Sequence, residues 1–387
     1  MYCKICGQQN CKKHSFLLGK PINIKEFSGS SPPEIFIGKW NYPNVYTGIL
    51  SPKEHGDTQI LSSPELWHEN KLSIPEIISL RNKLIYGRTQ SYIKMLNTKF
   101  LSILSEVAMT HKSVSTEFKL KKPIRKNEEQ DSRTPLIPKA AQVESVRLQE
   151  NVSIKPKIDY LVNDKDAKST IAIQELEKSG IPTSSIIKLL SAGLLGLKKN
   201  RKLVPTRWSI TAVDSTLSEK KIEKIKDFPH LNEFQVFHAE YLGNHYEILL
   251  IPRFWSFEVI EISQQSLGVW HDFESIFKRK TYADNVSGAY YANRLALTEY
   301  LEKIKRQASV IVFREISQEY TAPLGVGILR QTSRAAFLQA PKRFDSLQEA
   351  LQDIQSRLKL PIQKYTNCSQ LIKSMQQTTL NAFKKIQ

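Results

Sequence analysis

The spacing of apolar residues along the chain predicts strands at several places. Short runs rich in β-branched and aromatic residues, bounded by turn-forming residues, are typical of strands. Such runs flank the turn at 41–44 and recur through the second half of the chain. The predicted strands are residues 34–37, 45–47, 236–241, 245–252, 255–262, 309–316 and 325–330.

Other segments repeat their apolar residues every three or four positions, which predicts helices. Ser73 can cap one of them, and Pro75 suits its first turn. Further along, one helix is predicted to stop at Gly180, and the next to start at Thr183 and stop at Gly193. The predicted helices are residues 73–85, 89–109, 169–179, 183–192 and 285–307.

The helix pair between 169 and 193 resembles a helix-turn-helix, and a basic hairpin is predicted after it at 198–214. In a helix-turn-helix the second helix can read DNA. Paired amphipathic helices are also common packing units. The pair therefore has two interpretations, DNA reading and simple packing.

The charge of the chain indicates what kind of partner it meets. Lys and Arg number 56 against 38 Asp and Glu, so the formal net charge is +18. This excess predicts attraction to a polyanion such as DNA; the alternative is a basic surface with no specific partner. The most apolar stretch, 185–197, is interrupted by Lys188 and is too short to cross a membrane. Since the N-terminus also has no apolar signal segment, we expect a cytoplasmic, nucleoid-associated protein without membrane contact.

Three of the four cysteines lie within the first eleven residues, followed closely by a histidine. Cys3, Cys6, Cys11 and His14 follow the spacing C-x2-C-x4-C-x2-H. Three thiolates and one imidazole can hold a tetrahedral Zn²⁺ ion, and four protein ligands leave no open coordination position. The spacing therefore predicts a structural zinc knuckle, with a cysteine-rich terminus that binds no metal as the alternative.

Charged residues border apolar segments at several places in the second half of the chain. Arginines at such positions either hold an anionic ligand or pair with buried carboxylates, and the sequence leaves both interpretations open. The candidates for a catalytic role are Arg207, Asp214, Glu258, Arg294, Arg314 and Glu315. The candidates for binding phosphate or nucleic acid are Arg207, Tyr290, Arg294 and Arg314.

The C-terminal stretch QTTLNAFK fits the pattern Q-x-x-h-x-x-aromatic, in which h is aliphatic. One short turn there would place Leu380 and Phe383 on the same side, while Gln377 anchors the peptide by hydrogen bonds. The stretch resembles the PCNA-interacting peptide (PIP motif), by which repair proteins dock on the sliding clamp PCNA. An amphipathic last helix that packs on its own domain is the alternative.

Together these features predict an α+β fold, a mixed sheet with surrounding helices, with a small zinc knuckle at the N-terminus and an extended clamp-binding tail. The strands are expected to form one main sheet. The predicted regions are a zinc-binding knuckle at 1–20, an α/β region at 21–111, a basic linker or surface excursion at 112–157, an α+β core region at 158–358 and the tail at 359–387.

Several stretches together resemble the archaeal Nre family of DNA repair proteins. They span nearly the whole chain and include CKICGQQNCKKH, IFIGKWNYPNVYTG, LVPTRWSITAVD, SGAYYANRLALTEYL and the C-terminal motif. The resemblance implies a role in repair of DNA damage, an N-terminal zinc-finger-like element and clamp binding through the tail. It implies no particular reaction.

Two hypotheses follow. In the first, the protein is a DNA-binding repair factor that docks on the clamp and carries out no chemistry. In the second, it is an enzyme that processes DNA or a nucleotide, with a site around Arg207, Arg294 and Arg314. The second requires that these residues and nearby carboxylates meet in one cleft.

Overall fold

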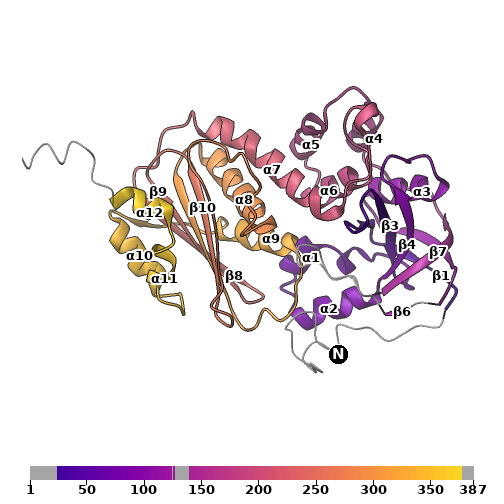
Figure 1. The fold of residues 1–387 in the computed structure, drawn as a ribbon, viewed down its shortest axis with the longest axis horizontal. Coiled ribbons are helices and arrows are strands. Elements are labelled where there is room, and N and C mark those ends of the chain that lie inside the picture. Colours follow the sequence, from indigo (N-terminus) through magenta and orange to yellow (C-terminus); the bar gives the residue numbers. More distant parts are fainter. Residues whose placement is uncertain (1–23, 124, 127–138, 377–387) are drawn as a thin grey trace, which may run out of the picture. The chain divides into compact units, whose positions relative to one another are not determined.

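The computed structural model describes residues 24–123, 125–126 and 139–376, and the chain divides into two compact units. Unit 1 comprises Met1–Leu217 and Thr321–Ile328, and unit 2 comprises Ser218–Tyr320 and Leu329–Gln387. Each unit holds one mixed sheet with helices around it (Figure 1). The α+β class is confirmed, whereas the expectation of one main sheet was wrong, because apolar periodicity locates strands without showing which strands pair.

The sheet of unit 1 has the strand order β1-β5-β7-β4-β3-β2, and β6 pairs with β7 outside this path. Only β4 and β7 run parallel among its described pairs. Buried residues of helix α3 (Lys99–Met109), such as Leu104 and Val107, share one core with Phe118 and Val143 of the sheet. The strands are β1 (Glu26–Ser31), β2 (Glu34–Ile37), β3 (Asn44–Ser51), β4 (Ile85–Tyr92), β5 (Val114–Leu120), β6 (Arg125–Lys126) and β7 (Lys139–Leu148).

The helices of unit 1 begin where the sequence offers caps. Ser73 and Glu76 form a capping box at the start of α2, with 2.7 Å between the Ser73 amide and the Glu76 carboxylate. The stops predicted at Gly180 and Gly193 are confirmed, and both glycines adopt the positive φ that favours glycine. The helices are η2 (Gln59–Leu61), α1 (Pro64–Glu69), α2 (Ile74–Lys83), α3 (Lys99–Met109), α4 (Pro156–Asn163), α5 (Ser169–Lys178), α6 (Thr183–Ser191) and η3 (Lys198–Asn200).

The sheet of unit 2 has the order β11-β10-β12-β9-β8-β13, in which β10 and β12 are parallel. One face packs on α8, whose Leu297 and Leu301 meet Phe237 and Val312, and the other face packs on the C-terminal helices α10 to α12 (Figure 1). The strands are β8 (Phe234–Tyr241), β9 (Asn244–Ile251), β10 (Ser256–Ser263), β11 (Val269–Glu274), β12 (Ser309–Ile316) and β13 (Lys342–Phe344). The helices are α8 (Gly288–Ile304), α10 (Leu347–Gln355), α11 (Gln363–Thr366) and α12 (Gln370–Gln376).

Two helices cross the boundary between the units in sequence, and both correct a prediction. The basic hairpin expected at 198–214 is instead η3 and the start of α7 (Thr206–Ile225). The strand expected at 325–330 is instead the start of α9 (Val326–Ala336). A short apolar run fits both a strand and a buried helix, and in both places the chain forms a helix that is longer than the run itself.

Two further expectations for unit 1 differ from the structure. The helix expected at 89–109 begins only at Lys99, after a Thr98 cap, because residues up to Tyr92 pair with β3 as strand β4. The segment 112–157, expected as a basic linker or surface excursion, contains β5 and β7, which lie inside the sheet. In its described part the basic side chains alternate with buried ones, as in Phe118-Lys119-Leu120. This alternation is the two-residue period of a strand, which the many charged residues of the segment made hard to recognise in the sequence.

None of the helices in the described ranges combines the length and the apolar character that a membrane crossing needs.

Candidate nucleic-acid interface

The turn between β2 and β3 presents aromatic side chains to solvent. Trp40 is 58% exposed and Tyr42 is 41% exposed. The turn is held by backbone hydrogen bonds, from the Asn44 amide to the Asn41 carbonyl at 2.8 Å and from the Ile93 amide to the Pro43 carbonyl at 3.1 Å. These hydrogen bonds fix the backbone of the turn, so the two exposed rings project from a backbone of defined conformation.

A third aromatic side chain reaches this turn from a distant part of the chain. Trp208, in the first turn of α7, is 45% exposed, and its ring centroid lies 5.2 Å from that of Tyr42 at an interplanar angle of 53°. The start of α7 is joined to β2 by a hydrogen bond of 2.9 Å from the Ile37 amide to the Thr206 hydroxyl. We call Trp40, Tyr42, Tyr92 and Trp208 the aromatic surface, since Tyr92 is also exposed and ends β4 directly opposite Asn44.

Cations accompany these rings. The Lys39 ammonium lies 4.4 Å from the ring centroid of Trp40. Arg207 precedes Trp208 at the start of α7, and Lys94 is exposed in the turn after Tyr92. Exposed aromatic faces bordered by basic side chains are the combination that binds single-stranded nucleic acid, through stacking of bases and attraction of phosphates.

The helix pair α5–α6 does not offer a comparable surface. Its second helix, α6, buries Ile186, Ile187 and Leu189 and packs against α3 and β2. A helix that reads the major groove must present one face to solvent. The geometry therefore favours the packing interpretation of this pair over the DNA-reading one.

In unit 2, the arginines singled out from the sequence are buried in ion pairs. The Arg294 guanidinium lies 2.8 Å from the Glu274 carboxylate and donates to the Ser218 hydroxyl at 3.1 Å. The Arg314 guanidinium lies 2.8 Å from the Glu261 carboxylate. Although burial alone would lower the pKa of Arg314, the Glu261 charge raises it further above its usual range.

Tyr290 lies on α8 near Arg294 and is also fully buried. Its ring centroid is 5.8 Å from the Arg294 guanidinium carbon and 4.9 Å from the ring centroid of Phe257. Burial raises the pKa of Tyr290 well above its usual range, and the Glu274 charge adds to this effect. Tyr290 is therefore a member of the core beneath the sheet.

Glu258 and Glu315 face the other side of the same sheet and hold the C-terminal helices. Glu258 contacts His271 at 2.6 Å and accepts from the Ser369 hydroxyl at 2.5 Å. Glu315 accepts from the Leu360 amide at 2.8 Å. Carboxylates used in this way act as anchors between a sheet and its covering helices.

The candidates within unit 2 do not meet in one site. Neighbours on a strand point to opposite faces of the sheet, so Arg314 lies on the α8 face and Glu315 on the face covered by α11. Arg294 and Arg314 share the α8 face but have different carboxylate partners. Arg207 and the buried Asp214 belong to the part of α7 in unit 1.

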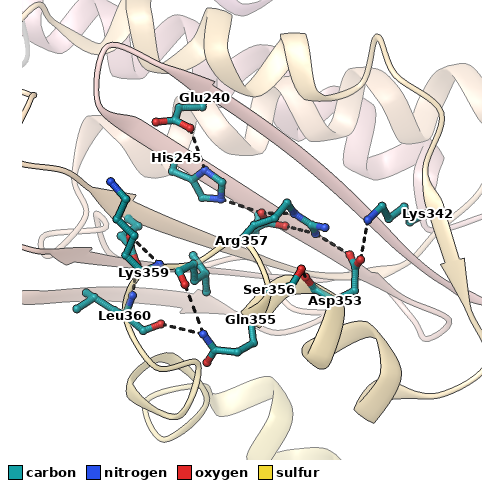
Figure 2. A network of polar contacts seen from close by, with 12 residues as sticks. Glu240, His245, Lys342, Asp353, Gln355, Ser356, Arg357, Lys359 and Leu360 are labelled. Atoms are coloured by element: carbon teal, nitrogen blue, oxygen red, sulfur yellow. Dashed lines mark hydrogen bonds and ion pairs between the residues drawn. The ribbon is translucent and has the colours of Figure 1, made fainter.

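A second ion-pair network, which the sequence did not suggest, fixes α10 to the sheet of unit 2 (Figure 2). The Arg357 guanidinium contacts the fully buried Glu247 at 2.7 Å and Asp353 at 2.6 Å. His245 contacts Glu247 at 2.8 Å, and Lys342 contacts Asp353 at 2.7 Å. The signal that could have found it is Glu247 itself, an acidic residue in the middle of the apolar strand β9.

The predicted zinc ligands and clamp motif lie outside the described residues. The zinc ligands are Cys3, Cys6, Cys11 and His14, and the motif residues are Gln377, Leu380 and Phe383. Within 24–123, 125–126 and 139–376, no group of three or more His, Cys, Asp and Glu side chains is placed to hold a metal ion.

Comparison with known proteins identifies the family. The N-terminal region of archaeal Nre matches residues 2–271, and its C-terminal region matches residues 274–383.

DNA repair protein NreB of Archaeoglobus fulgidus is 32% identical over 387 residues, which is 98% of this chain and 97% of that protein. DNA repair protein NreA of the same organism is 36% identical over 362 residues, 90% of each chain. DNA repair protein NreA of Haloferax volcanii is 32% identical over 344 residues, 84% of this chain and 81% of that protein. No solved structure matches the chain. Since both regions match and identity extends over nearly the whole length, the chain belongs to the archaeal Nre family.

Proposed function

We propose that this protein is a DNA repair factor that binds DNA containing unpaired bases and docks on the sliding clamp PCNA. The observation that carries the DNA-binding part is the pair of exposed rings, Tyr42 and Trp208, which two distant segments bring together. The names of the relatives, all DNA repair proteins, support the same process.

Exposed aromatic rings favour binding of DNA bases. Covering an apolar ring lowers the free energy, and each base offers a flat face that stacks on an aromatic side chain. Bases inside a duplex already stack on each other, so an aromatic surface favours gaps, forks and single strands. The net charge of +18 supplies attraction for the phosphates, which favours any DNA.

The N-terminal knuckle is proposed as a structural zinc element. Three thiolates and one imidazole are the donor set that zinc prefers in structural sites. The bound ion would fix the short segment that carries Cys3, Cys6, Cys11 and His14, with Lys12 and Lys13 between the ligands adding positive charge toward DNA.

The tail is proposed as the clamp contact, with Gln377 as the hydrogen-bonding anchor and Leu380 and Phe383 as the apolar contacts. Such docking would bring the DNA-binding units to replication and repair sites and account for an association with the nucleoid. An enzyme site around Arg207, Arg294 and Arg314 is not favoured, because Arg294 and Arg314 each pair with a buried carboxylate.

Binding of labelled single-stranded, gapped and duplex DNA to the full chain tests the first part. We expect tighter binding to single-stranded and gapped DNA, and an affinity that falls steeply with salt as counterions are released. Equal binding to all three DNAs would contradict base stacking, and an affinity that salt does not change would contradict phosphate contacts.

Binding of purified PCNA to the full chain tests the second part. We expect the triple variant Gln377→Ala, Leu380→Ala, Phe383→Ala to lose PCNA binding while its thermal unfolding stays unchanged. The matched control is Thr378→Ala, Thr379→Ala, at the motif positions that accept any residue. If the triple variant keeps its affinity for PCNA, the tail is not the contact.

A further inference from the structure

Unit 1 contains a cavity of about 290 Å³ that the interface described above does not use. It lies between β2, the start of α1, the start of α4 and the first turns of α6. Its size is near the lower end, roughly 300 Å³, of pockets that hold small molecules. The titratable residues that line it are Glu34, Glu65, His111, Lys155 and Lys188.

Lys188 lies in the second turn of α6 and lines the cavity together with Ser184 and Ser185. Side chains on a helix lean toward its N-terminus, so the Lys188 amine extends along the serine side of the cavity. Among the described residues, this amine forms no direct hydrogen bond and no ion pair within 4.0 Å, although the charges of Glu34 and Glu65 act on it. Burial lowers the pKa of Lys188, which increases the fraction of neutral, nucleophilic amine.

Glu34 faces the cavity from β2, where it precedes the buried Ile35. Its carboxyl likewise forms no direct hydrogen bond to a described residue. Burial raises the pKa of Glu34, against the opposing charges of Lys188 and Arg81, so a proton is held there more readily than on an ordinary glutamate. The cavity thus combines an amine that tends to be neutral with a carboxyl that tends to be protonated.

We propose that this cavity is an aldehyde-reactive site, in which the Lys188 amine forms a Schiff base and Glu34 transfers the protons. The assignment of the substrate rests on the proposed function: in a protein that binds DNA, the aldehyde is the C1′ carbonyl of a ring-opened abasic deoxyribose. Lys155, on the cavity wall, supplies a cation for a flanking phosphate.

The step balances without an added oxidant or reductant. The nitrogen lone pair of Lys188 attacks C1′, and the carbonyl oxygen takes a proton from the Glu34 carboxyl. The amine then gives a proton to the Glu34 carboxylate, and the hydroxyl leaves as water when it is protonated, which forms the C=N bond. Removal of a C2′ proton by Glu34 would next allow the C3′–O bond to break with the phosphate as leaving group. Water finally hydrolyses the imine and releases Lys188.

The test is reductive trapping with the full chain. A labelled oligonucleotide with one abasic site is incubated with the protein and sodium borohydride, and the adduct is resolved on a denaturing gel and mapped by mass spectrometry. We expect an adduct on Lys188 that is absent in Lys188→Arg, retained in the control Lys178→Arg, an exposed lysine outside the cavity lining, and formed about 100-fold more slowly in Glu34→Gln because proton transfer is lost. Thermal unfolding of each variant shows whether it is folded.

A second arm separates this proposal from the proposed function. Propanal and borohydride are added without DNA, and binding of the abasic oligonucleotide is measured separately. Labelling of Lys188 by propanal without adduct on DNA that the protein binds would overturn the abasic-site assignment. An adduct that maps elsewhere, or a folded Lys188→Arg variant that is trapped as well as the unchanged protein, would overturn the site itself. Failure to bind the oligonucleotide would instead contradict the proposed function, and Lys188 labelling by propanal would still support the reactive amine.

Discussion

The ring of Tyr42, in the turn between β2 and β3, lies 5.2 Å from the ring of Trp208 in the first turn of α7. The two residues are far apart in the sequence, and both rings remain exposed although they touch. Each ring keeps part of its flat apolar face uncovered, and the two ring planes are inclined to each other by 53°. Stacking of a partner's flat group on such a ring lowers the free energy.

Loss of one of these rings should weaken binding of single-stranded DNA. We expect Trp208→Ala to lower the affinity about 5- to 150-fold, because stacking on one base contributes about 1–3 kcal/mol. Fluorescence anisotropy of a labelled oligonucleotide measures the change. The matched control is Tyr160→Ala, an aromatic residue that is 63% exposed elsewhere in unit 1. Equal losses in both variants would indicate that the aromatic surface has no special role.

The Arg314–Glu261 pair should be a structural requirement of unit 2. Arg314→Met would leave the Glu261 carboxylate buried without its partner, and we expect the free energy of unfolding to fall by about 3–5 kcal/mol. The double variant Arg314→Met, Glu261→Met should recover much of this loss, because no charge remains buried. Urea denaturation of the full chain measures both changes.

A surface pair gives the control for that experiment. Arg343 pairs with Glu233, and the Arg343 side chain is 62% exposed. We expect Arg343→Met to change the free energy of unfolding by no more than about 1 kcal/mol. A similar loss in Arg314→Met and Arg343→Met would contradict the distinction between the buried and the exposed pair.

His245 should make the stability of unit 2 depend on pH. Burial alone would lower the pKa of His245, but the hydrogen bond to Glu247 and the charges of Glu247 and Glu240 raise it above its usual value. A raised pKa in the folded state means that the folded protein binds the proton more tightly. The stabilisation is therefore fully present below about pH 6.5, the ordinary histidine value, and is lost as the pH rises through the raised pKa.

The measurement compares the unchanged protein with His245→Gln at a series of pH values. We expect the stability difference to be largest below about pH 6.5, at about 1.5–3 kcal/mol for a charge-assisted hydrogen bond, and to shrink as the pH rises. His55→Gln, whose ring lies at the surface beside Ser28, is the matched control. A difference that does not change with pH would show that His245 acts through packing.

Removal of zinc should affect only the N-terminal knuckle. The predicted ligands lie within twelve consecutive positions, from Cys3 to His14, so the ion would order a local segment. We expect a chelator to release zinc, and the main thermal unfolding transition to keep its midpoint. Metal analysis and circular dichroism before and after chelation measure both effects. Collapse of the whole fold on chelation would mean that the knuckle is part of a larger core.

Elements with strong local signals could be predicted from the sequence. Ser73 and Glu76 are three residues apart, and the capping box needs only that spacing. The same is true of the stops at Gly180 and Gly193. Where a short run fitted two periods, as at 325–330, local signals gave the wrong element, because the choice depends on what the segment packs against.

The sites could not be predicted in the same way. The sequence marked Arg314 as unusual, yet its partner Glu261 is set by the parallel register of β10 and β12, which bring residues from distant segments face to face. The aromatic surface and the Lys188 cavity likewise join residues from different elements. A pattern of residue types gives no distances between such segments.

The sequence by itself therefore determined the excess of positive charge, the α+β class, some of the helices and strands, and membership of the archaeal Nre family. Each of these depends on composition, on local periodicity or on similarity along the chain. The tertiary structure decided that there are two sheets, that Arg294 and Arg314 are paired internally, and that Tyr42 meets Trp208. These depend on strand pairing and packing between distant segments, and those contacts exist only once the chain has folded.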